Sequence, residues 1–150
     1  MSLENNPYSY FETIPSRAGL APCTNKRATL LIFDEDQESL LLARRSNWPR
    51  GWSIIAEHVE EAKTPDEEAT NGLWDETGLD AAALSDFTLT GVIETTDTCR
   101  RRGTQHTTYI YEGIANTEVV TPNDEAERLV WMPLGFLLCF RIEPRHISLD

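Results

Sequence analysis

Three carboxylates fall on one face of segment 65–77 if that segment is helical. At about 100° per residue, Glu68, Asp75, Glu76 and the glycine at position 72 lie within roughly 100° of arc. Like charges stacked on one stripe of a helix repel one another, which costs stability. A hard divalent cation offsets that cost because it binds through several oxygens. The spacing therefore indicates a candidate metal site, and the alternative is a solvated acidic helix face.

Start and stop signals predict the helix that would carry these acids. Thr64 and Glu67 form a Thr-x-x-Glu capping box, and Pro65 suits the first helical position. Gly78 stands where a left-handed C-cap residue is expected. Gly72, in the middle of the helix, costs up to about 1 kcal/mol relative to alanine. Stability therefore does not account for Gly72.

The remaining elements follow from apolar patterns along the chain. They are a hairpin over 27–45 around the polar turn 34–38, a short strand near 52–56, strands over 86–96 and 105–115, and a strand turning into a short helix within 129–140. Residues 1–25 are predicted to be an N-terminal arm or edge strand, and residues 26–150 a single domain. The element order favours an α/β (α+β) domain with a mixed sheet.

Composition excludes several classes of partner. The 150 residues include 25 acidic and 13 basic side chains and carry a net charge of −12. Such a surface argues against a nucleic acid polymer and against an anionic membrane as partner. No apolar run approaches the roughly 18 residues of a membrane span. A cytoplasmic protein is expected, and its acidic, lysine-poor surface fits either a high-salt interior or an ordinary acidic protein.

Cysteines and histidines predict neither a disulfide framework nor a zinc site. The three cysteines are an odd number without C-x-x-C spacing, and no two of the three histidines have ligand spacing. The residues concerned are Cys23, Cys99, Cys139, His58, His106 and His146. Cys139 lies in an apolar run and is predicted to be core. A reducing compartment is the expectation.

The stretch 52–79 resembles a Nudix box. The family pattern is G-x5-E-x7-R-E-U-x-E-E-x-G-U, often preceded by W-x-x-P-G-G-x-V-E-x-G-E-T-P, where U is a bulky aliphatic residue. Matching positions are Trp52, Val59, Glu60, Thr64, Pro65, Leu73, Glu76, Gly78 and Leu79, with Asp75 standing for glutamate. The resemblance covers about 27–138 and implies a Nudix-type α/β/α sandwich with a mixed, curved sheet.

The resemblance also implies an activity. Nudix hydrolases cleave the pyrophosphate bond of a nucleoside diphosphate linked to another moiety, using Mg²⁺ or Mn²⁺. It assigns Asp75 and Glu76 to catalysis and to the metal. Glu68, one turn before Gly72, and Glu127, from the far side of the domain, are the expected additional metal ligands. The expected partner is a small-molecule nucleotide derivative.

Departures from the pattern make the box degenerate. Ala56-Glu57 replaces the paired glycines, Ala62-Lys63 the loop Gly-Glu, and Asn71-Gly72 the Arg-Glu of the helix. Two carboxylates are thus replaced, at Lys63 and Gly72, so weak activity is expected. The alternative is a non-catalytic Nudix-like module for nucleotide binding or regulation. Candidate substitutes are the acids of the adjoining loop, Glu57, Glu60 and Glu61, and Glu125 or Glu127 from the far side of the domain.

Other side chains are candidates for contacts with substrate or partner. Arg44 and Arg101 would attract phosphate groups, although Arg101 also suits a solvated loop tip. Trp48 would stack on a base, as would Trp52, for which packing is the simpler interpretation. The apolar residues of arm 1–22 predict packing on the domain or across a homodimer.

Overall fold

The computed structural model describes residues 21–46, 50–99 and 101–137. The strands are β1 (Lys26–Phe33), β2 (Ser39–Arg45), β3 (Gly51–His58), β4 (Leu84–Thr95), β5 (His106–Ala115) and β6 (Ala126–Pro133). The helices are α2 (Pro65–Thr77), the 3₁₀ turn η2 (Ala81–Ala83) and the short α3 (Leu134–Leu137). This order agrees with the sequence prediction, including a last strand, β6, that is followed at once by a short helix, α3.

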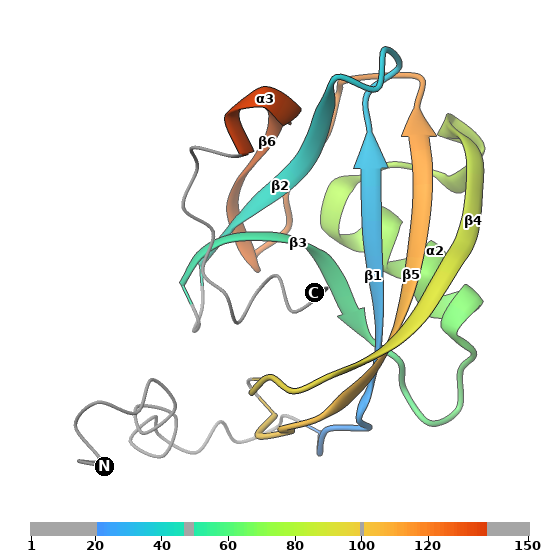
Figure 1. Cartoon of the computed structure of the whole chain (residues 1–150), viewed down its shortest axis with the longest axis vertical. Coiled ribbons are helices and arrows are strands. Elements are labelled where there is room, and N and C mark those ends of the chain that lie inside the picture. Colours follow the sequence, from blue (N-terminus) through green and yellow to red (C-terminus); the bar gives the residue numbers. More distant parts are fainter. Residues whose placement is uncertain (1–20, 47–49, 100, 138–150) are drawn as a thin grey trace.

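A single mixed sheet organises the described residues. Its six strands lie in the order β4-β5-β1-β3-β2-β6, with β1 parallel to β5 and the other neighbouring strands antiparallel. The turn between β1 and β2 is held by the Asp34 carboxylate, which accepts hydrogen bonds from the Glu38 and Ser39 amides at 2.8 and 3.0 Å. The mixed α+β class predicted from the sequence is confirmed (Figure 1).

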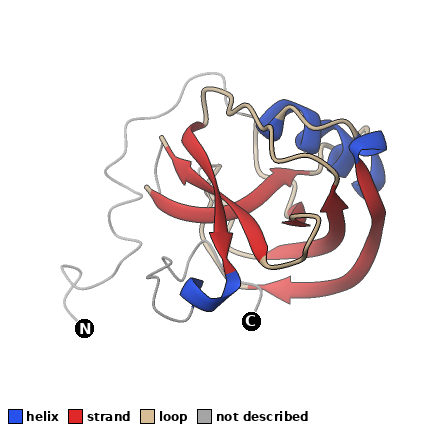
Figure 2. Cartoon of the chain, turned by 90° about the horizontal axis from the view of Figure 1, so that it is seen from above, coloured by secondary structure: helices blue, strands red, loops and turns tan. Residues whose placement is uncertain are grey.

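Alternating side chains give the sheet two apolar faces. On β1, Leu30 and Ile32 join the core beneath α2, whereas Leu31 and Phe33 belong to a second cluster. That second cluster includes Leu137 of α3. Helices thus lie on both sides of a curved sheet (Figure 2), which confirms the predicted α/β/α sandwich.

Helix α2 forms as its start and stop signals predict. Thr64 Oγ1 accepts from the Glu67 amide at 3.2 Å, and Glu67 Oε2 accepts from the Thr64 amide at 3.1 Å. Gly78 closes the helix with a φ of 71°. Between these caps the helix runs without a break through Gly72, with Ala69 and Leu73 buried against the sheet. The capping box therefore secures the helix despite its central glycine.

Some predictions fall on residues that the structure does not describe. Arm residues 1–20, Trp48, and the C-terminal stretch containing Cys139 and His146 are among them. Residues 21–25, the described part of the arm, belong to neither a helix nor a strand. Within the described ranges, none of the helices has the length and apolar character needed to cross a membrane.

Candidate functional site

The side chain of Glu57 lies over Gly72, where strand β3 meets helix α2. A Cβ added to Gly72 would stand 3.1 Å from the Glu57 Cβ, 3.4 Å from its Cγ and 3.8 Å from its Oε2. Glu57 therefore occupies space that a side chain at position 72 would need. The carboxylate that the box lacks on the helix is matched by one that reaches the same place from the sheet.

The sheet register positions Glu57. Ala28 of β1 is its cross-strand partner in the β1–β3 pairing, and α2 packs against both strands. Gly72 is buried at this contact. Only glycine lets the helix backbone come this close to a β3 side chain without a shift, because any Cβ would meet Glu57. Close approach, rather than helix stability, thus accounts for the glycine.

Acidic side chains around Glu57 raise its pKa. Burial, and then the charges of Glu125, Glu68 and Asp75, raise the pKa of Glu57 to about 7, against a lowering by Arg101. Two charges within reach of each other in a partly buried site disfavour double ionisation. The cluster therefore carries repulsion that a divalent cation would relieve.

Glu76 is the second strongly perturbed acid. Burial, the charges of Glu57 and Glu125, and a hydrogen bond with the Glu125 carboxyl raise the pKa of Glu76 well above its ordinary value, against a lowering by Arg45. Glu125 precedes strand β6, so acids from β3, α2 and the β6 side converge. Asp75, next to Glu76 on the helix, is exposed.

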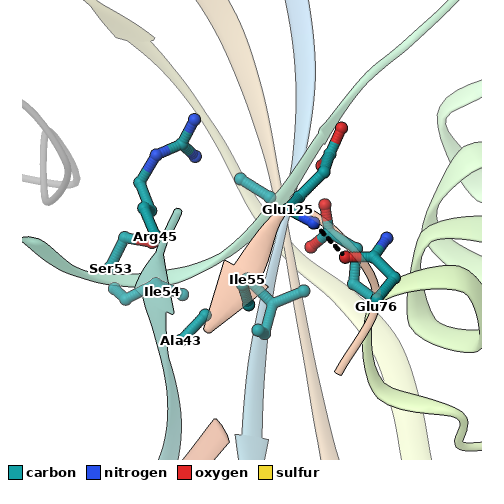
Figure 3. Close-up of a pocket in the computed structure, with 10 residues that line it drawn as sticks. Ala43, Arg45, Ser53, Ile54, Ile55, Glu76 and Glu125 are labelled. Atoms are coloured by element: carbon teal, nitrogen blue, oxygen red, sulfur yellow. Dashed lines mark hydrogen bonds between the residues drawn. The ribbon is translucent and has the colours of Figure 1, made fainter. Parts of the chain in front are cut away.

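A small open pocket borders these acids (Figure 3). It encloses about 310 Å³, part of it open to solvent. Glu76 and Glu125 lie side by side on its helix side, and Arg45 and Ser53 line it from β2 and β3. An anionic group entering it meets a guanidinium beside carboxylates, which suits a substrate that arrives with a cation.

Glu68, a predicted metal ligand, is already paired. Its Oε1 lies 3.3 Å from Lys63 Nζ, and the Glu68 side chain is only 7% exposed. Lys63 stands where the family has an acid, and it neutralises an acid of the helix. The positive charge of Lys63 is therefore balanced by the Glu68 carboxylate, which reduces its repulsion of a cation at the site.

The other predicted site residues are more dispersed. Glu127 Oε2 of β6 lies 3.4 Å from Arg44 Nε of β2, and both side chains are about half exposed. Arg44 also stands over the Trp52 ring, 5.7 Å from its centroid. Arg101 donates to Glu60 Oε1 at 2.7 Å. Asp75, Glu76 and Glu68 thus share one helix with Gly72, whereas Glu127 and the arginines hold separate ion pairs.

Two acids of the cluster carry more weight than the sequence assigned them. Glu57 was visible as a glutamate in the place of a family glycine, beside a glycine in the place of a family glutamate. The glutamate and the glycine have thus changed places relative to the family pattern, and this exchange was the signal in the sequence. Glu125 is two residues from Glu127 in sequence, and it is Glu125, in the turn before β6, that bonds to Glu76.

The fold agrees with the comparisons to known proteins. The chain belongs to the NUDIX domain family, whose model matches residues 24–149. No curated protein matches the sequence. The Nudix family suggested by the box is thereby confirmed.

Solved structures share the fold at low identity. The Escherichia coli dihydroneopterin triphosphate pyrophosphohydrolase has a TM-score of 0.72 and 15% identity, with 85% of this chain and 92% of that chain covered. The NUDIX domain of Shewanella oneidensis NrtR, in complex with ADP ribose, has a TM-score of 0.67 and 16% identity, with 96% and 94% covered. A Caenorhabditis elegans Ap4A hydrolase binary complex has a TM-score of 0.62 and 17% identity, with 76% and 83% covered.

Proposed function

We propose that this protein hydrolyses the pyrophosphate bond of a nucleoside diphosphate linked to another moiety, with Mg²⁺ or Mn²⁺. The observation that carries the proposal is the position of Glu57 over Gly72. A chain that had merely lost its helix carboxylate would leave a hole or an apolar filling there. Instead the side chain of Glu57, on the neighbouring strand, brings a carboxyl group to the same place.

The donor set fits a hard divalent cation. Carboxylate oxygens are the ligands that Mg²⁺ and Mn²⁺ prefer, and Glu57, Asp75 and Glu76 would hold such an ion. When bound, the cation neutralises the pyrophosphate and favours attack by water. Glu125 steadies Glu76 through their hydrogen bond, and Arg45, across the pocket, supplies positive charge to the phosphate side. Arg44, Trp48 and Arg101 stay proposed substrate contacts.

The second candidate is a nucleotide-binding or regulatory module without hydrolysis. The ion pair between Lys63 and Glu68 favours it, because it engages an acid that the metal would otherwise use. In that case nucleotide would bind at the pocket without turnover. The two candidates differ in one measurable property, the release of phosphate.

A panel of nucleotide substrates tests the proposal. ADP ribose, Ap4A and dihydroneopterin triphosphate, compounds named with the structural relatives, join nucleoside triphosphates in an assay with Mn²⁺ or Mg²⁺. Released phosphate is measured with and without a coupling phosphatase. Glu57→Gln should lower kcat at least about 100-fold, the scale of losing one group from a catalytic site. Glu35→Gln removes an exposed acid from the β1–β2 turn and is the matched control.

Exchange of the two positions makes the test specific. Glu57→Gly with Gly72→Glu should restore much of the activity that Glu57→Gln removes, since the carboxylate then comes from the helix. Equal activity of wild type and Glu57→Gln would refute the role of Glu57. Nucleotide binding without turnover by wild type would reject the hydrolase in favour of the module.

A further inference from the structure

Two cysteines and two histidines meet at the end of the sheet where β1 and β5 begin and β3 ends. They are Cys23, His58, Cys99 and His106, and one potential ligand atom from each lies within 4.8 Å of all the others. Cys23 Sγ is 3.4 Å from His106 Nε2. Tetrahedral zinc with Zn–S and Zn–N bonds of about 2.0–2.3 Å places its ligand atoms about 3.3–3.8 Å apart. The four groups are thus close to the spacing of a Cys₂His₂ centre.

The sheet register brings these distant positions together. In β1, Arg27 is opposite His58 of β3, and Lys26 is opposite Thr107 of β5. Cys23 stands three residues before the start of β1, and His106 is the first residue of β5. In Figure 1 the starts of β1 and β5 and the end of β3 lie at the same lower end of the sheet. No pair has the short spacing of a zinc motif because the ligands come from four separate segments.

Neighbouring groups orient one of the histidines toward the cluster. His106 is buried, and its Nδ1 lies 3.1 Å from Asp97 Oδ1. Arg27 fixes that carboxylate by donating to both of its oxygens, at 2.6 and 3.1 Å. The Nε2 atom of His106 therefore points to Cys23. A carboxylate that holds the far nitrogen of a histidine is the usual support of a zinc ligand.

The other three groups are held in place at the cluster, and one of their polar atoms lacks a partner in the part of the chain that the structure describes. His58 Nε2 is buried and has no hydrogen-bond partner among the described residues. A backbone amide donates to each sulfur at 3.3 Å, from Asn25 to Cys23 and from Gly103 to Cys99. These amides hold each sulfur in place beside the imidazoles, and a metal that bound there would displace the thiol protons. An orphaned buried nitrogen is costly unless something is bound to it.

Gly103 makes room for the two sulfurs. A Cβ at this position would lie 2.3 Å from Cys23 Sγ and 3.3 Å from Cys99 Sγ. The turn that carries it is closed by the Cys99 amide donating to the Gly103 carbonyl at 3.0 Å. Both cysteines are free thiols in the structure. A disulfide between them would not account for the two imidazoles beside the sulfurs. A metal bound by all four groups would.

We propose that Cys23, His58, Cys99 and His106 bind a structural Zn²⁺ ion, separate from the acidic cluster. Thiolate and imidazole select zinc over magnesium or manganese. Four protein ligands complete the tetrahedron and leave no position for a substrate, which defines a structural site. The ion would tie the segment before β1 and the β4–β5 hairpin to the end of β3, the strand that carries Glu57.

Metal analysis of the purified full-length chain tests the proposal. Protein produced with added zinc should hold about one zinc per chain after dialysis, and cobalt exchange should produce the thiolate-to-cobalt bands of a tetrahedral site. Cys99→Ala and His106→Ala should lower zinc affinity more than about tenfold, since they remove ligands themselves. Cys139→Ala and His146→Ala, which alter the remaining cysteine and histidine, should leave it unchanged.

A measurement on the unaltered chain covers the case in which those variants fail to fold. Alkylation of Cys23 and Cys99, followed by peptide mass spectrometry, should be slow with zinc and fast after chelation, and chelation should lower the melting temperature. The proposal would be overturned if the protein held no zinc and the alkylation rate were the same with and without the chelator. A Cys23–Cys99 disulfide, found as a cross-linked peptide, would overturn it too. None of these readouts involves nucleotide turnover.

Discussion

Asp97 Oδ1 lies 3.1 Å from Nδ1 of His106, and this contact determines which ring nitrogen of the histidine faces Cys23. The carboxylate is itself held by Arg27 from the first strand. A residue that touches no proposed zinc ligand atom thereby sets the direction of one ligand. This relationship leads to a prediction about metal affinity.

Asp97→Ala should weaken zinc binding by about 10–100-fold, the effect of losing such a support. Asp97→Asn keeps an oxygen acceptor for the imidazole and should lose less. Competition with a chromophoric chelator measures both affinities. Glu94→Gln, an exposed acid on the same hairpin that bonds to Thr107, is the control. Equal affinity of Asp97→Ala and wild type would show that His106 needs no support.

Gly72→Ala should stabilise the protein less than helix propensity predicts. Alanine in a helix gains up to about 1 kcal/mol over glycine, but here its Cβ would meet the Glu57 Cβ at 3.1 Å. In a Glu57→Gly background that contact is gone, so the full gain should appear. Urea unfolding of the four proteins of this cycle measures the coupling. Strict additivity would mean that the two residues do not compete for space.

Glu57→Gln should stabilise the chelator-treated protein at pH 8 and have little effect at pH 5. The pKa of Glu57 is raised from 4.5 to about 7 in the folded protein. Between these two pKa values the folded state therefore binds more protons than the unfolded state. Stability therefore falls as pH rises through this window. The expected gain at pH 8 is about 1–3 kcal/mol, reduced by partial solvent contact. Thermal melts of both proteins across pH 5–8 measure the gain in stability. An equal gain at pH 5 and pH 8 would show that ionisation of Glu57 is not its cause.

Lys63→Met should cost about 1–2 kcal/mol without divalent cations. The buried Glu68 carboxylate loses the ammonium 3.3 Å away, although Lys63 is 46% exposed and its pairing is partly screened. If Glu68 belongs to the metal site, saturating Mn²⁺ should recover that loss, and Mn²⁺ should bind more tightly than to wild type. Calorimetric titration measures the affinity. Unchanged Mn²⁺ affinity would place Glu68 outside the site.

Local signals determined the elements that carry the site. The capping box at Thr64 and Glu67, the proline after it and Gly78 define both ends of α2, because each acts on backbone groups within one turn. The apolar runs of β1 and β2 on either side of the polar turn predicted the hairpin for the same reason. Strand β4 begins at Leu84, two residues before the predicted start. Asp86 has a φ of 55° there, and the β4–β5 register shifts between Ser85 and Thr88. That irregularity interrupts the alternation on which the prediction relied.

Long-range packing decided what the sequence left open. The pattern showed that Gly72 had lost a carboxylate, but only the approach of β3 to α2 showed that Glu57 fills its place. The cysteines and histidines had no ligand spacing, and the sequence prediction of no zinc motif followed from that alone. Their meeting depends on the parallel β1–β5 pairing and the antiparallel β1–β3 pairing. Periodicity reports which face a residue is on, whereas strand order and register decide which distant residues share that face.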